Sequence, residues 1–133
     1  KPNNVFVAGF IGSPAMNFIP AKIKIKSHET IAETKNGDKI KIKSSEDLSE
    51  GQNILCGIRP EHLEISNENK GIKIEVSVVE PTGADTLLFS KSNDVELCSI
   101  FKERVKLKPG ESLNLVADVE NIHIFDFENK KRI

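Results

Sequence analysis

Residues 19–26 read IPAKIKIK, and this stretch decides the fold class. Every second residue is apolar and lysines fill most positions between: the apolar residues are Ile19, Ala21, Ile23 and Ile25, and the lysines are Lys22, Lys24 and Lys26. Successive side chains of a β-strand point to opposite faces of its sheet. The stretch therefore predicts a strand with isoleucines on its buried face and lysines in water.

Four further segments repeat this alternation. They are 39–43 (KIKIK), 72–78 (with Ile72, Ile74, Val76 and Val78 inward), 113–119 (LNLVADV) and 122–127 (IHIFDF). Turn signals separate them, such as KNGD at 35–38, PTGAD at 81–85 and KPGE at 108–111. Short strands at this spacing predict an antiparallel sandwich or small barrel. No long amphipathic helix alternates with them, which argues against a parallel α/β fold.

Two segments depart from this regular pattern. In VELCSIF (95–101) the alternation slips after Leu97, which predicts a β-bulge of the kind that bends strands in small barrels. Residues 3–12 (NNVFVAGFIG) predict a short helix, with asparagine as its N-cap and Gly12-Ser13-Pro14 as its end. The chain begins with Lys1 rather than methionine, so we interpret it as a fragment: residues 1–16 link an upstream domain to a body at 17–133.

Composition narrows the function classes. The 133 residues suffice for one compact domain, and the net charge of −1 argues against a general binder of polyanions. Cys56 and Cys98 lie in apolar runs, which predicts buried free thiols in a reducing compartment. No apolar run approaches the roughly 18–20 residues of a membrane span.

The residues of familiar catalytic and metal sites do not occur at the required spacings. His28, His62 and His123 lack the short-range histidine or cysteine partners of a zinc site. The sequence contains neither a G-x-S-x-G elbow nor the G-x-x-x-x-G-K-[ST] loop that cradles ATP phosphates. We therefore predict no catalytic, cofactor-binding or metal-binding residue in these 133 residues.

The lysine rows at 22–26 and 39–43 would form one basic face if the two strands paired. Barrels that bind single-stranded nucleic acid also present aromatic platforms for the bases. This chain has no Trp and no Tyr, and five of its seven Phe residues stand beside apolar neighbours. We interpret the lysines as a solvated face that discourages edge-to-edge aggregation, and expect no nucleic-acid partner.

The stretch GIRPEHLEI (57–65) brings an arginine, a glutamate and a histidine together, yet architecture explains it. Pro60 holds Arg59 extended and can begin a helical turn, since its missing N–H costs nothing there. Glu61 is then favoured near the positive end of the turn. Leu63 and Ile65 return to the apolar layer. Arg59, Glu61 and His62 can bond to neighbouring backbone or across a domain interface.

Four stretches in this order resemble one known family: FVAGFIGSPAMNF (6–18), GIRPEHLEI (57–65), VVEPTGADTLLF (78–89) and ENIHIFDFENKKRI (120–133). The chain is similar to the C-terminal domain of ATPase subunits of sugar ABC importers, the group of the maltose and sn-glycerol-3-phosphate importers. The resemblance covers nearly the whole chain. It departs at the end, where DFENKKRI replaces a tight turn, and at Pro81, where an apolar residue is common.

The resemblance implies an OB-fold-like antiparallel β-barrel with a short N-terminal helix, also called a transport-associated OB domain. It implies a non-catalytic dimerisation and regulatory role, with ATP and magnesium bound in the missing ATPase domain. Implied partners are that ATPase domain, a second copy, a regulatory protein and, indirectly, the membrane-spanning subunits. The implied location is the cytoplasmic face of the cell membrane. Candidate interface or regulatory residues are Arg59, Glu61, His62, Gly83 and Asp85; structural turn residues are Gly57, Pro60 and Pro81.

Two alternatives stay open. The first is a small-ligand module that binds oxyanions, through exposed amides near Gly83 and the PEHL turn. The second, less favoured, is a nucleic-acid-binding OB barrel. For Gly83 we also predict a positive φ, because it follows Pro81-Thr82 in a turn.

Overall fold

The structure is a computed structural model of the 133-residue chain, and it describes residues 15–133. The predicted helix at 3–12 lies outside the described residues, as does nearly all of the predicted linker at 1–16. Its regular secondary structure is almost entirely antiparallel strand, which confirms the predicted mainly-β, OB-fold-like class.

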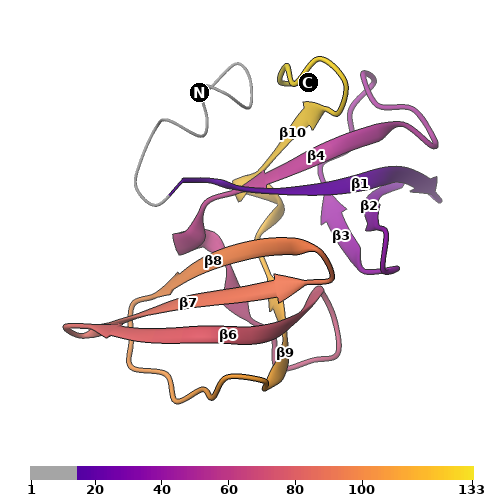
Figure 1. Ribbon diagram of the computed structural model, residues 1–133. Helices are drawn as coiled ribbons and strands as arrows, with labels where there is room; N and C mark the ends of the chain where they lie inside the picture. Colours follow the sequence, from indigo (N-terminus) through magenta and orange to yellow (C-terminus); the bar gives the residue numbers. More distant parts are fainter. Residues whose placement is uncertain (1–14) are drawn as a thin grey trace.

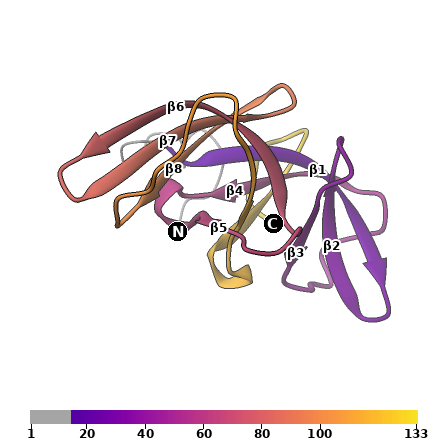
Figure 2. The ribbon, with the colours of Figure 1, turned by 90° about the horizontal axis from the view of Figure 1, so that it is seen from below.

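The strands form two five-stranded sheets (Figure 1). The first has the order β10-β4-β1-β2-β3 and comprises β1 (Asn17–Lys26), β2 (Glu29–Thr34), β3 (Lys39–Ile42), β4 (Asn53–Ile58) and β10 (Ile122–Asp126). The second has the order β5-β9-β6-β7-β8 and comprises β5 (Glu64–Ile65), β6 (Ile72–Thr82), β7 (Asp85–Ser92), β8 (Val95–Phe101) and β9 (Ser112–Val116). Two short 3₁₀ helices, η1 (Pro60–His62) and η2 (Val119–Asn121), interrupt them. Figure 2 shows how the sheets curl around a common interior.

The core fills the space between the sheets. Its fully buried side chains come from both, among them Ile19, Ile23, Ile54 and Ile58 from the first sheet and Ile72, Ile74, Val76, Leu88 and Leu115 from the second. One buried side chain also ties the sheets together. Asn17 Nδ2 donates to the carbonyls of Ile58 (3.1 Å) and Cys98 (2.8 Å), and its Oδ1 accepts from the Cys98 amide (2.8 Å). Asn17 thereby joins β1 to β8, an edge strand of the second sheet.

The alternation predicted for 19–26 holds over most of β1 and fails at its end. Ile19, Ala21 and Ile23 are buried, but Ile25 is 44% exposed. The paired register with β4 ends at Lys22, and beyond it Ile23 still exchanges backbone hydrogen bonds with Gly51 and Gln52. Ile25 lies past these backbone bonds, near the end of β1, where its side chain reaches water.

The predicted bulge in 95–101 is wrong. β7 and β8 pair from Thr86–Phe101 to Ser92–Val95 without a shift in register. Ser99 is simply a small polar residue on the inner face, fully buried, and this produced the apparent slip. The bulge lies in β6 instead, between Val76 and Val78. It turns Val78 outward, 45% exposed, against the prediction that Val78 faces the core.

Candidate functional site

The segment 57–65 crosses from one sheet to the other. Arg59 is extended (φ −73°, ψ 147°), Pro60 begins η1, and the His62 amide donates to the Arg59 carbonyl at 2.9 Å. Leu63 is 1% exposed and anchors the end of the turn in the core. The predicted role of Pro60 is thus confirmed. Both the pre-proline restriction on Arg59 and the proline-started turn are local effects, which the sequence alone contains.

Gly57 and Pro81 lie inside strands, not in the turns predicted for them. Gly57 belongs to β4, and a Cβ there would stand 2.6 Å from Met16 Sδ and 2.9 Å from Phe125 Cε1. The lack of a side chain at Gly57 lets Met16 and Phe125 pack directly against the β4 backbone. Pro81 is an exposed residue of β6 that pairs with Thr86. A missing N–H is tolerated at such a position near a strand end.

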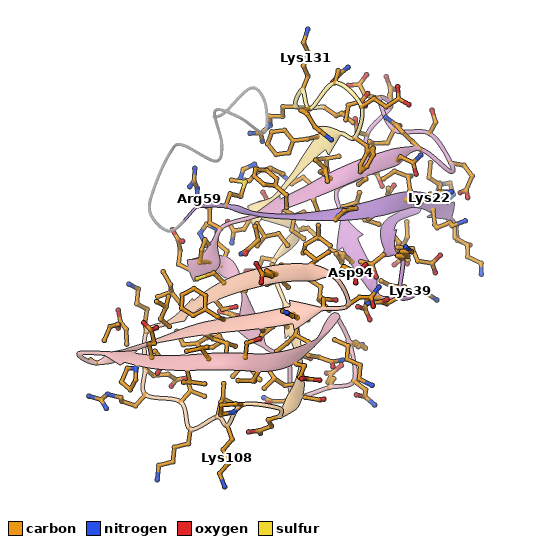
Figure 3. All side chains as sticks on the ribbon, in the orientation of Figure 1. Lys22, Lys39, Arg59, Asp94, Lys108 and Lys131 are labelled. Atoms are coloured by element: carbon orange, nitrogen blue, oxygen red, sulfur yellow. The ribbon has the colours of Figure 1, made fainter. Side chains whose placement is uncertain are left out.

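One candidate residue of the turn, Glu61, lines a groove of about 600 Å³ between η1, β5 and the end of β8 and is exposed on its rim. His62 is half-buried and does not line the groove. His62 Nδ1 is buried and has no hydrogen-bond partner among residues 15–133. Arg59 is half-buried, and in Figure 3 it lies on the opposite side of the molecule from Lys22 and Lys39.

The β6–β7 hairpin holds the other two candidates. Gly83 has φ +66°, which confirms the predicted positive φ, and its carbonyl accepts from Arg104 Nε at 2.8 Å. Asp85 Oδ2 lies 3.5 Å from Lys102 Nζ, and Lys102 lines the groove that Glu61 also lines. Asp85 therefore reaches the groove only through its ion pair with Lys102, and Gly83 shapes the hairpin.

Sequence reasoning missed an exposed apolar patch on the outer face of the second sheet. Val78 and Phe89 oppose each other across β6 and β7, and are 45% and 36% exposed. Half-buried neighbours on β7 and β8 extend the pair, and we call the set the outer patch: Val78, Leu87, Phe89, Cys98 and Ile100. The bulge in β6 exposes Val78, and the alternation alone gave no sign of that bulge.

Both cysteines are free, as predicted, but only one of the two predicted buried thiols is buried, since Cys98 is half-buried on the outer face of β8. Cys56 is buried in the core, and burial raises the pKa of its thiol to about 12. Partial burial raises the pKa of the Cys98 thiol, and the negative charge of Glu80 adds to the effect. Both thiols therefore stay protonated at neutral pH and lack nucleophilic character.

The lysine rows do not form a continuous basic face. Strands β1 and β3 do not pair, because β2 lies between them, and Glu33 stands between Lys22 and Lys39 in the register. Lys41 Nζ also lies 3.6 Å from Glu29 Oε1. Interleaved carboxylates weaken the attraction for a phosphate backbone, which supports the solvated-face interpretation.

Residues 15–133 contain no cluster of three histidine, cysteine or acidic side chains that could hold a metal ion. In the same part of the chain, no helix has the length and apolar character needed to cross a membrane.

Comparison with known proteins identifies two family models. Residues 12–63 match the MalK OB fold domain, and residues 56–125 match the TOBE domain. Among solved structures, the cytoplasmic molybdate-binding protein ModG shares the fold, with a TM-score of 0.64 at 16% identity over 81% of this chain and 94% of that one.

Curated relatives align with the whole chain. An uncharacterized ABC transporter ATP-binding protein of Sinorhizobium fredii is 38% identical over 133 residues, which are 100% of this chain and 35% of the relative. The sn-glycerol-3-phosphate import ATP-binding protein of Ruegeria sp. is 34% identical, over 100% of this chain and 36% of its own length. The oligosaccharides import ATP-binding protein of Bacillus subtilis is 35% identical, over 99% and 38%.

The chain thus spans about a third of the length of these relatives. The TOBE model alone matches more than half of the chain, over the segment that carries the turn, the groove wall and the outer patch. The chain therefore belongs to the TOBE domain family and corresponds to the C-terminal domain of an ABC importer ATP-binding protein.

Proposed function

We propose that this chain is the non-catalytic dimerisation and regulatory domain of the ATP-binding subunit of an importer for sn-glycerol-3-phosphate or a sugar. The names of the relatives support the class of solute. ATP and magnesium bind in the ATPase domain of the same subunit, and this domain contributes no group to hydrolysis. The subunit works on the cytoplasmic face of the membrane, beneath the membrane-spanning subunits.

The observation that carries the self-association is the outer patch. A two-fold contact uses the same surface on both copies, so a patch with an apolar centre is complementary to itself. Val78 and Phe89 provide that centre, and charged Glu80, Lys91 and Glu96 lie around it on the same strands. We expect a contact on the order of 1,000 Å² or more in total if it persists without the ATPase domains.

Sedimentation of the purified chain tests this directly. Wild type should dimerise, and Phe89→Lys should shift it to monomer, because two lysines would meet across the two-fold axis. Ile25→Lys is the matched control, since Ile25 is as exposed as Val78 but lies outside the patch. A wild-type chain that stays monomeric at high concentration, or a Phe89→Lys variant that dimerises normally, contradicts the proposal.

For regulation, we propose Arg59, Glu61, His62 and Asp85 as contact residues. Three of them belong to the turn between the sheets, and Asp85 pairs with Lys102, which lines the same groove as Glu61. In the full-length subunit, Arg59→Ala should weaken the coupling of hydrolysis to transport while basal ATP hydrolysis continues. Complete loss of hydrolysis would place Arg59 in the catalytic machinery instead.

The oxyanion alternative finds less support at the PEHL turn. η1 has three residues and begins with a proline, and the adjoining groove is rimmed by carboxylates. The second candidate anion site was the exposed amides near Gly83, and there the cationic group is Arg104, whose Nε donates to the Gly83 carbonyl. Calorimetry with phosphate, sulfate, molybdate and glycerol-3-phosphate tests this alternative. Saturable heat from any of them would support an anion site, and no heat from all four would rule it out.

A further inference from the structure

We propose that the groove between η1, β5 and the end of β8 binds a polypeptide segment of a partner protein, in which arginine or lysine side chains alternate with apolar ones. The groove shares Ile100 with the outer patch but not the Val78–Phe89 centre, and its other half-buried apolar residues, Ile65 and Val105, lie outside the patch.

The floor of the groove is apolar. Leu63 and Phe101 close it from the core side, and the half-buried side chains of Ile65, Ile100 and Val105 remain accessible. A bound segment would remove this apolar surface from water, which favours binding. That contribution requires apolar side chains in the partner as well as charged ones.

The rim carries one sign of charge. Glu61, Glu64 and Glu103 line the groove, and none of them is ion-paired within residues 15–133. The single lysine of the rim, Lys102, is 3.5 Å from Asp85 and so is largely compensated. The resulting negative potential favours a cationic partner and repels an anionic one.

The chemistry of the rim narrows the ligand. The carboxylates do not converge as a metal-binding cluster does. Charges spaced around an apolar floor match a chain that presents cations and apolar groups in turn, as a polypeptide segment does. The volume, about 600 Å³, accommodates several side chains.

One wall of the groove is already ordered. The buried Thr86 hydroxyl donates to the Glu103 carbonyl at 2.8 Å and accepts from the Val105 amide at 3.0 Å. These bonds hold residues 103–105, which have no regular secondary structure, against β7. A partner therefore meets a preformed wall, and less conformational entropy is lost on binding.

Methyl NMR of the whole chain with synthetic peptides tests the proposal. A short peptide that alternates leucine and arginine should shift the methyls of Ile65, Ile100 and Val105 in a saturable way, more weakly as salt rises. A leucine–glutamate peptide of equal length should not bind, and an arginine-only peptide should bind at least about threefold more weakly, because it leaves the floor uncovered.

Charge reversal supplies the matched variants. Glu64→Lys with Glu103→Lys should weaken the leucine–arginine peptide by about tenfold or more, and Glu46→Lys, an exposed charge outside both the groove and the outer patch, should leave its affinity unchanged. Both variants should keep the wild-type melting temperature. The proposal is overturned if the peptide gives no saturable shift, if the leucine–glutamate or arginine-only peptide binds equally well, or if the double variant retains wild-type affinity.

Discussion

Strands β1 and β6 begin alike and end differently. Each buries three apolar residues at two-residue spacing and then exposes the fourth: Ile25 is 44% exposed in β1, and Val78 is 45% exposed in β6. In β1 the strand outruns its neighbour β4, whereas in β6 a bulge reverses the side-chain direction. Nearly equal exposure therefore has two causes.

The consequences differ as well. Ile25 stands alone near the tip of the β1–β2 hairpin, among polar residues such as His28 and Thr30. Val78 faces Phe89 and belongs to the outer patch. An isolated exposed apolar residue is ordinary, but a contiguous apolar patch marks an interaction surface. The four predictions below test this contrast, beginning with the largest effect.

Aspartate substitutions at Ile23 and Ile25 should show where burial ends along β1, because the first position is in the core and the second is exposed. Ile23→Asp places a charge at a fully buried site and should cost roughly 4 kcal/mol or more, enough to prevent folding. Ile25→Asp should cost less than about 1 kcal/mol, because the side chain already reaches water. Urea unfolding followed by circular dichroism measures both. Similar losses of unfolding free energy at the two positions would mean that Ile25 is also buried in the core.

The buried thiol of the first sheet should make stability fall at alkaline pH. The pKa of Cys56 rises from 9.0 in the unfolded chain to about 12 in the fold, so only the unfolded chain loses this proton between those values. The contribution is complete below pH 9 and declines by about 1.4 kcal/mol per pH unit up to about pH 12. Unfolding free energies of wild type and Cys56→Ala at several pH values provide the measurement. Parallel curves would refute the buried thiol.

Whereas the outer face of the second sheet exposes Val78 and Phe89, the outer face of the first sheet carries buried apolar side chains around Gly57. There Met16, Leu55 and Phe125 are nearly inaccessible, and Phe18 packs edge-on against Phe125 at 5.6 Å. Gly57→Ala should destabilise the chain by about 1–3 kcal/mol, since its methyl meets Met16 and Phe125.

The Gly57→Ala effect has an internal control. Combined with Met16→Ala, which removes the Sδ atom nearest the new methyl, the loss should be smaller than the sum of the two single losses. Strict additivity in thermal melts would show that steric contact with Met16 is not the cause.

The hairpin turns after β1 and β6 both require a positive φ, and they place different residues there. Gly83 takes φ +66° with open space around it, whereas Ser27 and His28 adopt φ 48° and 69° without being glycine. Gly83→Val should cost about 1–2 kcal/mol, and Gly83→Asn much less, because asparagine tolerates this region. Conversely, His28→Gly should raise stability by a few tenths of a kcal/mol to about 1 kcal/mol. Melting temperatures compare them, and an unchanged Gly83→Val would refute the turn assignment.

Much of the fold could be predicted, because its signals are local. The alternation in 19–24, 39–43 and 72–76, the proline-started turn at Pro60 and the positive φ of Gly83 all appear as expected. The candidate site was predicted less completely. Glu61 could be named from its motif, but its neighbours in the groove, Ile100 and Glu103, come from strands and loops roughly 40 residues away.

The sequence by itself determined which residues can face inward and where the chain turns, because both follow from the backbone of a few consecutive residues. Only the tertiary structure decided how far each inward face stays covered, that β2 separates the lysine strands, and that a bulge in β6 exposes Val78. Coverage depends on the length and register of neighbouring strands. Those are set by hydrogen bonds between distant segments, such as the pairing of β4 with β10, and no local pattern encodes them.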